Sequence, residues 1–531
     1  MDLHTAGHRR GVVAAPHGAA VEAGHAMLAE GGNALEAMVA MAAAIAVAYP
    51  HMNHLGGDGF WLLREPSGKI RALMAAGAAG ANARRELYRD AGHDVIPPRG
   101  PLAALTVPAA VAGWILALDA ARAHGGKLPL DTLLAPAIRL ATDGVPVSRS
   151  LAANVAATAA ELKDVPGFAA TFLTDGKPPA QGAVLKQAAL AATLEHLAHA
   201  GLDDFYRGDV GREIAGDLER IGSPVTRADL ERCRATVAEP LSVGLAAGTA
   251  YNTPPPTQGL ASLMILALFE RLRVTEAESF DHVHGLIEAA KRALRLRDRT
   301  ITDPARLPHP PDRYLAPTFL DAEAQTIDRR KASAWLPSAG DGDTIWMGAA
   351  DASGLVVSYI QSLYWEFGSG CVLPSTGVLM QNRGTSFSLE RGALNPLEPG
   401  RLPPHTLNPA LAVLRDGRVI AYGTMGGDAQ PQIQAALFTR HVVFRQPLDE
   451  ALDRPRWFVG RTWGSSHGNV LAEGRLDGNL IDRLMAAGHD VMVLAEPYAG
   501  AMGHAGAVVL HPGGTFEGAH DPRADGGAAG V

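Results

Sequence analysis

The stretch from Gly340 to Gly370, GDGDTIWMGAADASGLVVSYIQSLYWEFGSG, contains two strand-forming runs separated by a turn. The runs TIWMGAAD and LVVSYIQSLYW are rich in β-branched and aromatic residues, and the tetrad DASG (351–354) between them is typical of a tight turn. With the two central residues of that tetrad as the loop, the pairing register places Thr344 opposite Gln361. The sequence therefore predicts a β-hairpin whose first strand begins with a hydroxyl group.

Thr344 could act as a nucleophile if the chain were cut immediately before it. A threonine hydroxyl is a weak nucleophile unless a base takes its proton, and a chain-terminal threonine carries such a base in its own α-amine, whose pKa is roughly 8. In the uncut chain this nitrogen belongs to a peptide bond. Cleavage of the Asp343–Thr344 bond by the Thr344 hydroxyl would create the catalyst. A threonine that merely begins a strand is the alternative, and the local pattern alone does not exclude it.

Composition and charge restrict the function classes. The chain has 531 residues, with 47% hydrophobic and 19% charged side chains, as in ordinary globular proteins. A net charge of -8 without a dense Lys/Arg block argues against a nucleic-acid-binding surface. Cys233 and Cys371 are too few for a disulfide framework, which suits a reducing compartment. No secretory signal precedes the first helical stretch, so we expect a cytoplasmic protein.

The longest apolar run, AMVAMAAAIAVAY (Ala37–Tyr49), is too short to span a bilayer. It follows Asn33, a good N-cap, and is apolar all round, so we expect a buried core helix and no membrane partner.

Four further segments give structural expectations. GFWLLREPSGKIRALM (59–74) is expected to be a hairpin, and TPPPTQG (253–259) an ordered, extended loop. Residues 321–343 are polar and irregular, which predicts an exposed connection. The tail DPRADGGAAGV (521–531) is expected to be mobile.

Several blocks, in order along nearly the whole chain, resemble the γ-glutamyltranspeptidase family of N-terminal-nucleophile hydrolases. They are the N-terminal block from GVVAAPHG to GGDGFW (11–61), NTPPPTQG (252–259), HVHGLIEAAKRALRLRDR (282–299), the hairpin from Thr344, FGSG (367–370), PSTGVLMQNRG (374–384), HTLNPALAV (405–413) and GTMGG (423–427).

This resemblance implies an α+β fold, a four-layer αββα sandwich of two stacked sheets covered by helices. It also implies cleavage into a large fragment, 1–343, and a small fragment, 344–531, which stay intertwined as one structural unit. These form one heterodimer or a pair of heterodimers. Thr344 becomes the nucleophile, and Gly426 and Gly427 supply the backbone N–H groups of the oxyanion hole, where a glycine lets the backbone approach the reacting carbonyl.

The chain departs from the family pattern where transpeptidases bind the glutamyl group. The segment that holds an arginine for the α-carboxylate is MAAG (74–77) here. The key acid for the α-amino group corresponds to Ser386, and Arg383 occupies an amino-binding position. The serine pair near the carboxylate site corresponds to His405-Thr406.

Two more positions differ on the second strand of the hairpin: the helper threonine becomes Ser362, and a neighbouring asparagine becomes Tyr364. The pocket has thus lost an acid and gained a guanidinium, which binds carboxylates bidentately.

These changes favour an anionic substrate without an amino group. Together with DTIWMGAAD, IQSLYWEFGSG and MQNRG, they are most similar to the oxamate amidohydrolase branch of the family, which implies hydrolysis of a small 2-oxo acid amide through an acyl-threonine, without a cofactor. Arg383 would bind the carboxylate with His405 and Thr406.

Alternatives remain open. Arg383 could be a structural salt-bridge partner, and His405 a packed loop residue. The enzyme could be a γ-glutamyltransferase or glutathione hydrolase, with water or an amine as acceptor, or an uncut binding protein. A metal site is not expected, because His282 and His284 are two residues apart on a helix and no H-E-x-x-H motif is present.

Overall fold

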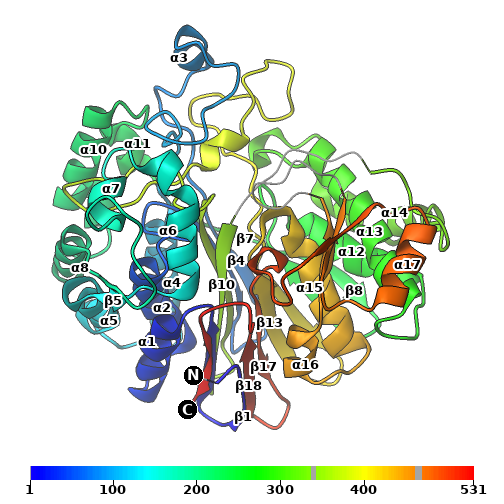
Figure 1. Cartoon of the computed structure of the whole chain (residues 1–531). Coiled ribbons are helices and arrows are strands. Elements are labelled where there is room, and N and C mark those ends of the chain that lie inside the picture. The colour runs from blue at the N-terminus through cyan, green and yellow to red at the C-terminus, as the bar shows by residue number, and fades with distance from the viewer. Residues whose placement is uncertain (1, 336–342, 461–468) are drawn as a thin grey trace.

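Two stacked β-sheets, with helices on both outer faces, form the molecule (Figure 1). The computed structural model describes residues 2–335, 343–460 and 469–531. The predicted four-layer αββα sandwich is confirmed.

Each main sheet has seven strands, and every neighbouring pair within it is antiparallel. The first sheet has the order β19 (Gly527–Gly530), β2 (Gly11–Ala15), β10 (Asp343–Asp351), β11 (Val356–Tyr364), β3 (Asp58–Arg64), β4 (Ile70–Ala75) and β7 (Thr236–Ala238). The second has the order β1 (His4–His8), β18 (Phe516–His520), β17 (Ala505–Leu510), β13 (Val419–Thr424), β12 (Ala410–Leu414), β9 (Gly248–Asn252) and β8 (Leu241–Leu245). Two smaller sheets are formed by β14 (Trp457–Val459), β15 (Val470–Glu473) and β16 (Val491–Leu494), and by β5 (Val145–Pro146) and β6 (Val184–Leu185).

The central strands are hydrophobic on both faces because both faces are covered. Trp346 and Ile360 belong to the cluster between the two sheets, whereas Ile345, Met347 and Tyr359 belong to the cluster beneath the helices. This is the period-two alternation of a strand, with an apolar layer on each side. The hairpin is therefore packed against the second sheet on one face and against helices on the other.

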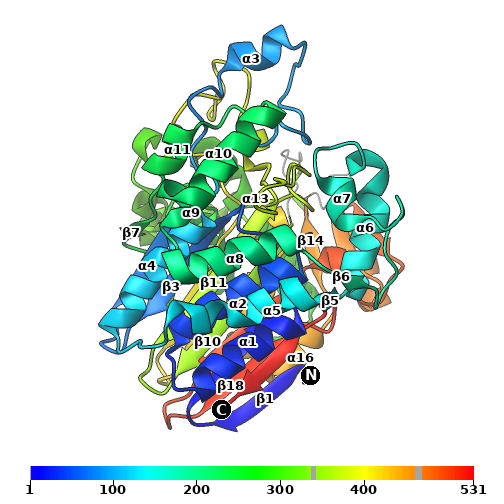
Figure 2. The ribbon, with the colours of Figure 1, turned by 90° about the vertical axis from the view of Figure 1, so that its left-hand side faces the viewer.

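Helices cover the first sheet on the left of Figure 1, with α1, α2, α5 and α8 in front of it in Figure 2. This half contains α1 (Gly18–Ala29), α2 (Ala34–Ala48), α3 (Arg85–Asp90), α4 (Ala110–Ala123), α5 (Leu130–Asp143), α6 (Arg149–Leu162), α7 (Phe168–Phe172), α8 (Ala188–Ala200), α9 (Asp204–Arg207), α10 (Asp209–Ile221) and α11 (Arg227–Arg232). The other half contains α12 (Gly259–Arg271), α13 (Phe280–Thr300), α14 (Pro317–Gln325), α15 (Gln430–Phe438), α16 (Leu448–Asp453) and α17 (Gly478–Ala486).

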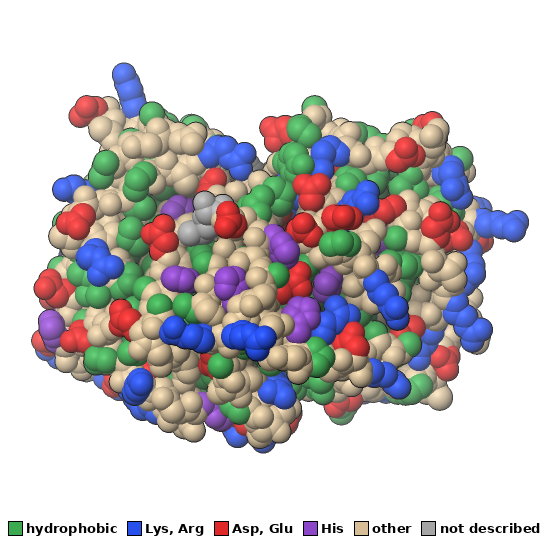
Figure 3. Space-filling view, turned by 90° about the horizontal axis from the view of Figure 1, so that it is seen from below, with side chains coloured by type: hydrophobic (Ala, Val, Ile, Leu, Met, Phe, Trp, Pro, Cys, Tyr) green, Lys and Arg blue, Asp and Glu red, His purple; other side chains and the backbone are tan. Residues whose placement is uncertain are grey.

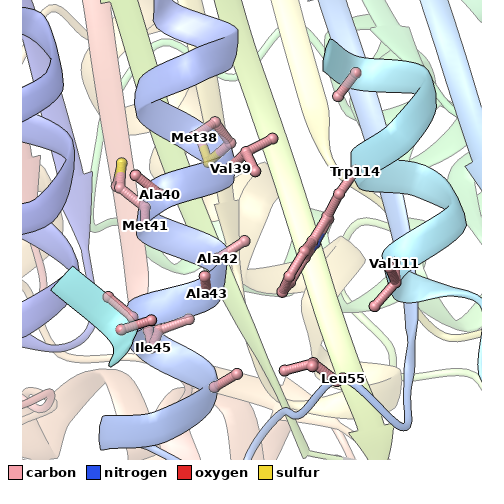
Figure 4. Packing of buried hydrophobic residues seen from close by; sticks show 14 of the residues in the cluster. Met38, Val39, Ala40, Met41, Ala42, Ala43, Ile45, Leu55, Val111 and Trp114 are labelled. Carbon is pink, nitrogen blue, oxygen red and sulfur yellow. The ribbon is translucent and has the colours of Figure 1, made fainter. Parts of the chain in front are cut away.

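The apolar run is the buried helix α2, as predicted. All of its residues are buried, and Asn33 forms a capping box with Glu36. Figure 4 shows Val39 and Ala42 of this helix facing the region of Trp114 on α4. The 59–74 hairpin is confirmed by the pairing of β3 with β4, and Thr253, Thr257 and Gln258 of the 253–259 loop are buried.

The register predicted for the hairpin is wrong by one residue. Ile345, not Thr344, pairs with Gln361. The reason is the turn: Asp351 and Leu355 are bonded across three loop residues, and Gly354 has a φ of 86°. A three-residue loop that ends in a left-handed glycine shifts the register relative to a two-residue loop.

The expectation of a mobile C-terminal tail is also wrong. Residues 527–530 form β19, which pairs with β2 at the edge of the first sheet, and Arg523 is buried between Glu473 and Asp521. Part of the predicted connection 321–343 is helix α14, and residues 336–342 lie outside the described residues.

No helix among the described residues is both long and apolar enough to cross a membrane. On the face seen from below Figure 1, basic and acidic side chains are interspersed (Figure 3).

Candidate active site

Thr344 is the second residue of β10, a central strand of the first sheet, and it is buried. The ladder between β10 and β11 is irregular at this position, since Asp343 pairs with Tyr364 and Ile345 with Gln361. Thr344 therefore lies opposite Ser362 and Leu363, at a local bulge. Bulges of this kind re-aim a side chain relative to a regular strand.

The glycine pair predicted for the oxyanion hole follows β13, a central strand of the second sheet that packs against β10. Gly426 has a φ of 116° and Gly427 a φ of 51°, both in the left-handed region that favours glycine. A short 3₁₀ turn, Gly427–Ala429, then leads into α15. The glycine pair is thus at the N-terminal end of a helix, where backbone N–H groups favour negative charge.

Gln430, the first residue of α15, reaches the predicted nucleophile. Its Nε2 donates to Thr344 Oγ1 over 3.4 Å, and Gln430 is fully buried. The structure thereby brings the glycine-pair segment of the second sheet to the start of β10 in the first.

Arg383 is buried, and its guanidinium is stacked on an aromatic ring. Its Cζ lies 3.5 Å from the ring centroid of Tyr364. Its Nη2 donates to Thr406 Oγ1 over 3.2 Å, and its Nη1 lies 3.5 Å from the Pro404 carbonyl oxygen. Among the described residues, no carboxylate lies within ion-pair distance of this guanidinium. In the described part of the chain, Arg383 therefore has no acidic partner that would make it a structural salt-bridge residue.

Burial lowers the pKa of Arg383 to about 10, and Tyr364, Asp58 and Asp428 act in the opposite direction. The guanidinium is still protonated at neutral pH. A buried positive charge without an ion-pair partner attracts an anionic ligand.

His405 lies beside a buried acid that the sequence analysis did not identify. Its Nε2 is 3.2 Å from Asp58 Oδ2, and its ring packs edge-on against Phe60 at 4.8 Å. Asp58 Oδ1 accepts hydrogen bonds from Gly77 N–H and Gln381 Nε2. Burial, followed by the nearby Arg383, lowers the pKa of His405 to about 4. His405 is therefore a neutral imidazole at physiological pH, next to an ionisable carboxyl.

Ser362 and Ser386 bond to backbone groups around Arg383. Ser362 Oγ accepts from the Tyr364 N–H over 2.7 Å, and Tyr364 has a φ of 86°. A left-handed conformation in a large side chain is uncommon and often marks a functional site. Ser386 Oγ donates to the Arg383 carbonyl over 2.8 Å. These bonds fix the backbone that carries the stacked pair.

A cleft of about 820 Å³ brings most of the predicted binding residues together. Its lining includes Tyr364, Arg383, Ser386, His405 and Thr406. Ser362 and Thr344 are not among the residues that line it.

The acids that line the cleft are already paired with arginines, in contrast to Arg383. Asp428 and Asp298 contact Arg297 at 2.5 and 2.7 Å, and Asp94 and Glu390 contact Arg89 at 2.5 and 2.6 Å. Each of these four acids therefore already has a cationic partner, although each arginine is shared by two acids.

Comparison with known sequences now decides the family: the gamma-glutamyltranspeptidase sequence profile matches residues 20–531. The chain belongs to the gamma-glutamyltranspeptidase family. It is 52% identical to an oxamate amidohydrolase proenzyme of Klebsiella pneumoniae, over 98% of each chain. It is 37% identical to a glutathione hydrolase-like proenzyme of Bacillus subtilis, again over 98% of each.

A cephalosporin acylase structure from Bacillus halodurans superimposes on this family member with a TM-score of 0.91 and 31% sequence identity, covering 99% of this chain and 97% of the acylase. All three relatives are named as enzymes that act on amides. The prediction of an amide-cleaving enzyme with the N-terminal-nucleophile hydrolase fold is confirmed at this level.

The sequence analysis did not identify several residues that connect the parts of the candidate site in this family member. Gln258 Nε2 donates to the carbonyl oxygens of Thr406 and Gly427, and Gln258 Oε1 accepts from Arg297. The TPPPTQG loop thus joins the Arg383 region to the glycine pair. Gln258 stands in a segment that matched the family, and Asp58 in the glycine-rich GGDG, but their partners are distant in sequence and no local pattern indicates them.

A second polar cluster lies away from the cleft, on α13. His284, Glu288 and His489 are buried, with ligand-type atoms within 4.8 Å of one another. His284 and Glu288 are four residues apart and share a helix face, a spacing that the analysis of His282 and His284 overlooked. His282 instead bonds to Thr439.

Proposed function

We propose that this family member is an autoprocessing N-terminal-threonine amidohydrolase that converts oxamate to oxalate and ammonia. The observation that carries the proposal is the buried guanidinium of Arg383, which lines the cleft, whereas the acids of the cleft are paired. The name of the relative that is 52% identical supports the same substrate.

The first reaction in this proposal is cleavage of the chain by itself. Thr344 Oγ attacks the carbonyl carbon of Asp343, and the Asp343–Thr344 C–N bond breaks to give an ester and a free α-amine. Water then hydrolyses the ester. The products are a large fragment, 1–343, and a small fragment, 344–531. They remain associated as a heterodimer, because in each of the two sheets strands of one fragment pair with strands of the other.

Turnover then uses the amine that cleavage creates. The α-amine of Thr344 takes the proton of its own Oγ, and Oγ attacks the amide carbon of oxamate. Gly426 and Gly427 donate N–H groups to the developing oxyanion. The C–N bond breaks, and the nitrogen leaves as ammonia with the proton. Water attacks the oxalyl ester with the amine as base, oxalate leaves, and the proton returns to Oγ.

Substrate recognition in this proposal rests on charge. Arg383 binds the carboxylate of oxamate, with Thr406 and the neutral His405 as hydrogen-bonding neighbours. Nε2 of His405 faces Asp58 at 3.2 Å, whereas Nδ1 has no hydrogen-bond partner among the described residues, so a ligand can supply one. Ser362, Tyr364 and Ser386 hold this arrangement. The cytoplasmic location and the pairing of heterodimers stay predictions from the sequence.

Ammonia release from a panel of short amides tests the substrate. The panel contains oxamate, the amides of neutral acids of similar size, and a γ-glutamyl anilide, whose cleavage releases an aniline. Oxamate turnover well above that of the neutral amides supports the proposal. Efficient cleavage of the γ-glutamyl anilide with little oxamate turnover would instead favour a glutathione hydrolase.

A further inference from the structure

Gln430 contacts the atom that must act as both nucleophile and leaving group. Its Nε2 is the donor 3.4 Å from Thr344 Oγ1, and its side chain is fully buried. The amide oxygen Oε1 has no hydrogen-bond partner within the described residues. A buried amide oxygen without a partner is disfavoured, and such groups occur at functional sites.

The second half of the proposed reaction gives this contact a chemical role. Water attacks the carbonyl carbon of the oxalyl ester, and the C–Oγ bond breaks with its electron pair on Oγ. Negative charge therefore develops on Oγ before the α-amine returns the proton. A fixed N–H donor at Oγ stabilises that charge, and both Thr344 and Gln430 are buried.

We propose that Gln430 is a catalytic residue that stabilises Thr344 Oγ as the leaving group when the acyl ester is hydrolysed. Its unpaired Oε1 accepts a hydrogen bond from the α-amine that cleavage of the chain creates. The inference rests on the proposed function, because it requires Thr344 to carry the acyl group. The same contact acts on the ester formed during self-cleavage.

Gln430→Glu keeps the shape of the side chain but replaces the N–H donor. We expect kcat for oxamate to fall about 100-fold with KM unchanged or lower, and the small fragment to accumulate the mass of an oxalyl group. Gln432→Ala is the control on the same helix: Gln432 bonds to the Val459 backbone, so no acylated fragment should accumulate.

Wild-type kcat in Gln430→Glu, or a change in KM alone, would overturn the inference. If Gln430→Glu stays uncut, it is treated with hydroxylamine, which cleaves esters but not peptide bonds under mild conditions. Splitting of the chain between residues 343 and 344 would show a trapped ester and support the role of Gln430. A chain that stays intact would overturn it. Activity of Thr344→Ala would refute the proposed function itself, whereas an inactive Thr344→Ala with a normal Gln430→Glu would refute only this inference.

A separate observation concerns the polar cluster on α13 and the segment 328–335, which leads toward the proposed cleavage site. Its backbone is bonded to neighbouring elements at five points, one of which is the Ala334 carbonyl oxygen, which accepts from Arg295. His284 Nε2 lies 2.8 Å from the Asp328 carbonyl oxygen, Lys291 Nζ donates to the Ser333 carbonyl oxygen over 2.8 Å, and Ser333 N–H donates to Glu288 Oε1 over 3.1 Å. Ala332 N–H donates to the carbonyl oxygen of Ala487, in the small fragment, over 2.8 Å.

The cluster forms one directional chain of hydrogen bonds. Lys291 donates to His489 Nδ1 at 3.4 Å, so His489 Nε2 is the protonated nitrogen and donates to His284 Nδ1 at 2.8 Å. His284 Nε2–H then donates to the Asp328 carbonyl oxygen. All four ring nitrogens are used, and burial, followed by the charge of Lys291, lowers the pKa of His489 to about 3. The ammonium of Lys291, bonded to Glu288 at 2.8 Å, supplies the positive charge that a metal ion would bring.

We infer that this cluster is the docking interface by which the small fragment and α13 hold the C-terminal segment of the large fragment after cleavage. His489 and Ala487 come from the small fragment, and the other groups from the large one. The segment itself is otherwise exposed at residues 328–331, so it depends on these bonds for its position.

Trypsin tests this second inference, because Arg329, Arg330 and Lys331 are exposed sites for it within the held segment. In the processed protein, Lys291→Met and Ser333→Pro should each raise the rate of cleavage there at least tenfold, and Lys163→Met, an exposed lysine on another element, should not. Ser333→Pro removes the N–H that donates to Glu288 but changes no side chain of the buried cluster, so it gives a result even if Lys291→Met fails to fold.

Equal cleavage rates in wild type and Ser333→Pro would overturn the docking role. Stoichiometric Zn²⁺ binding that is lost in His489→Ala would also overturn it, by showing a metal site. The uncut Thr344→Ala chain should show the same protection, so this test does not depend on whether self-cleavage occurs.

Discussion

The guanidinium of Arg383 lies over the ring of Tyr364, with 3.5 Å between its Cζ and the ring centroid. Tyr364 reaches this position in a left-handed backbone conformation, which the bond from its N–H to Ser362 Oγ supports. The stack orients a planar fork of donors in the cleft, as bidentate carboxylate binding requires.

Arg383→Ala should raise KM for oxamate by about 10- to 150-fold, because a hydrogen bond to a charged group contributes about 1.5–3 kcal/mol. Self-cleavage should stay intact, since this residue binds substrate and not Asp343. Arg383→Lys should recover little of the loss, because an ammonium lacks the planar fork. Steady-state kinetics with oxamate measure both, and unchanged constants in Arg383→Ala would refute the assignment.

Tyr364→Phe keeps the aromatic ring and should leave KM within about threefold of wild type, whereas Tyr364→Leu removes the stack and should raise KM about tenfold, which corresponds to about 1.4 kcal/mol. The pair of variants separates the ring from the hydroxyl. A large effect of Tyr364→Phe together with a small effect of Tyr364→Leu would show that the hydroxyl, not the stack, matters.

Gly426→Ala should lower kcat about 100-fold, because the left-handed backbone that aims the N–H groups is unfavourable for alanine by about 1–2 kcal/mol. Gly68→Ala is the matched control: Gly68 has a φ of 88° in the exposed turn between β3 and β4. Both variants should lose similar stability in urea denaturation. Only Gly426→Ala should lose activity, and equal activity in the two would contradict the oxyanion role.

Stability should fall as the pH is lowered from about 6.5 to about 4. Burial lowers the pKa of His51 and His54 to about 3, and of His405 and His504 to about 4, whereas an unfolded histidine titrates near 6.5. In this window the unfolded chain binds protons that the folded chain does not, so the free energy of unfolding decreases. Urea midpoints between about pH 7 and about pH 4 measure it, and a flat or rising midpoint on acidification would contradict the assignment.

Local patterns were sufficient for the elements that form the sandwich. Period-two alternation located both strands of the hairpin, and the capped apolar run located α2. The fold itself was predicted from motifs in family order. Register was not available from the pattern, because the difference between a two- and a three-residue turn depends on the conformation of Gly354. The tail was misjudged because its small residues fit the edge position beside β2, a tertiary contact that composition does not show.

In the candidate site, too, some residues were predicted from the sequence and others were found only in the structure. Thr344, Arg383 and the glycine pair were found because they stand at positions that match family motifs, although their roles stay predictions. Asp58, Gln258 and Gln430 were missed because each acts through a partner more than 80 positions away. Only the fold brings such pairs together.

The most direct test of the account is the new chain end itself. Purified wild-type protein should give two bands of roughly two-thirds and one-third of the chain on a denaturing gel, in proportion to the proposed fragments. N-terminal sequencing of the smaller band should read Thr-Ile-Trp-Met, from Thr344. Thr344→Ala should remain one inactive band. Active protein that stays uncut, or activity in Thr344→Ala, would contradict the account.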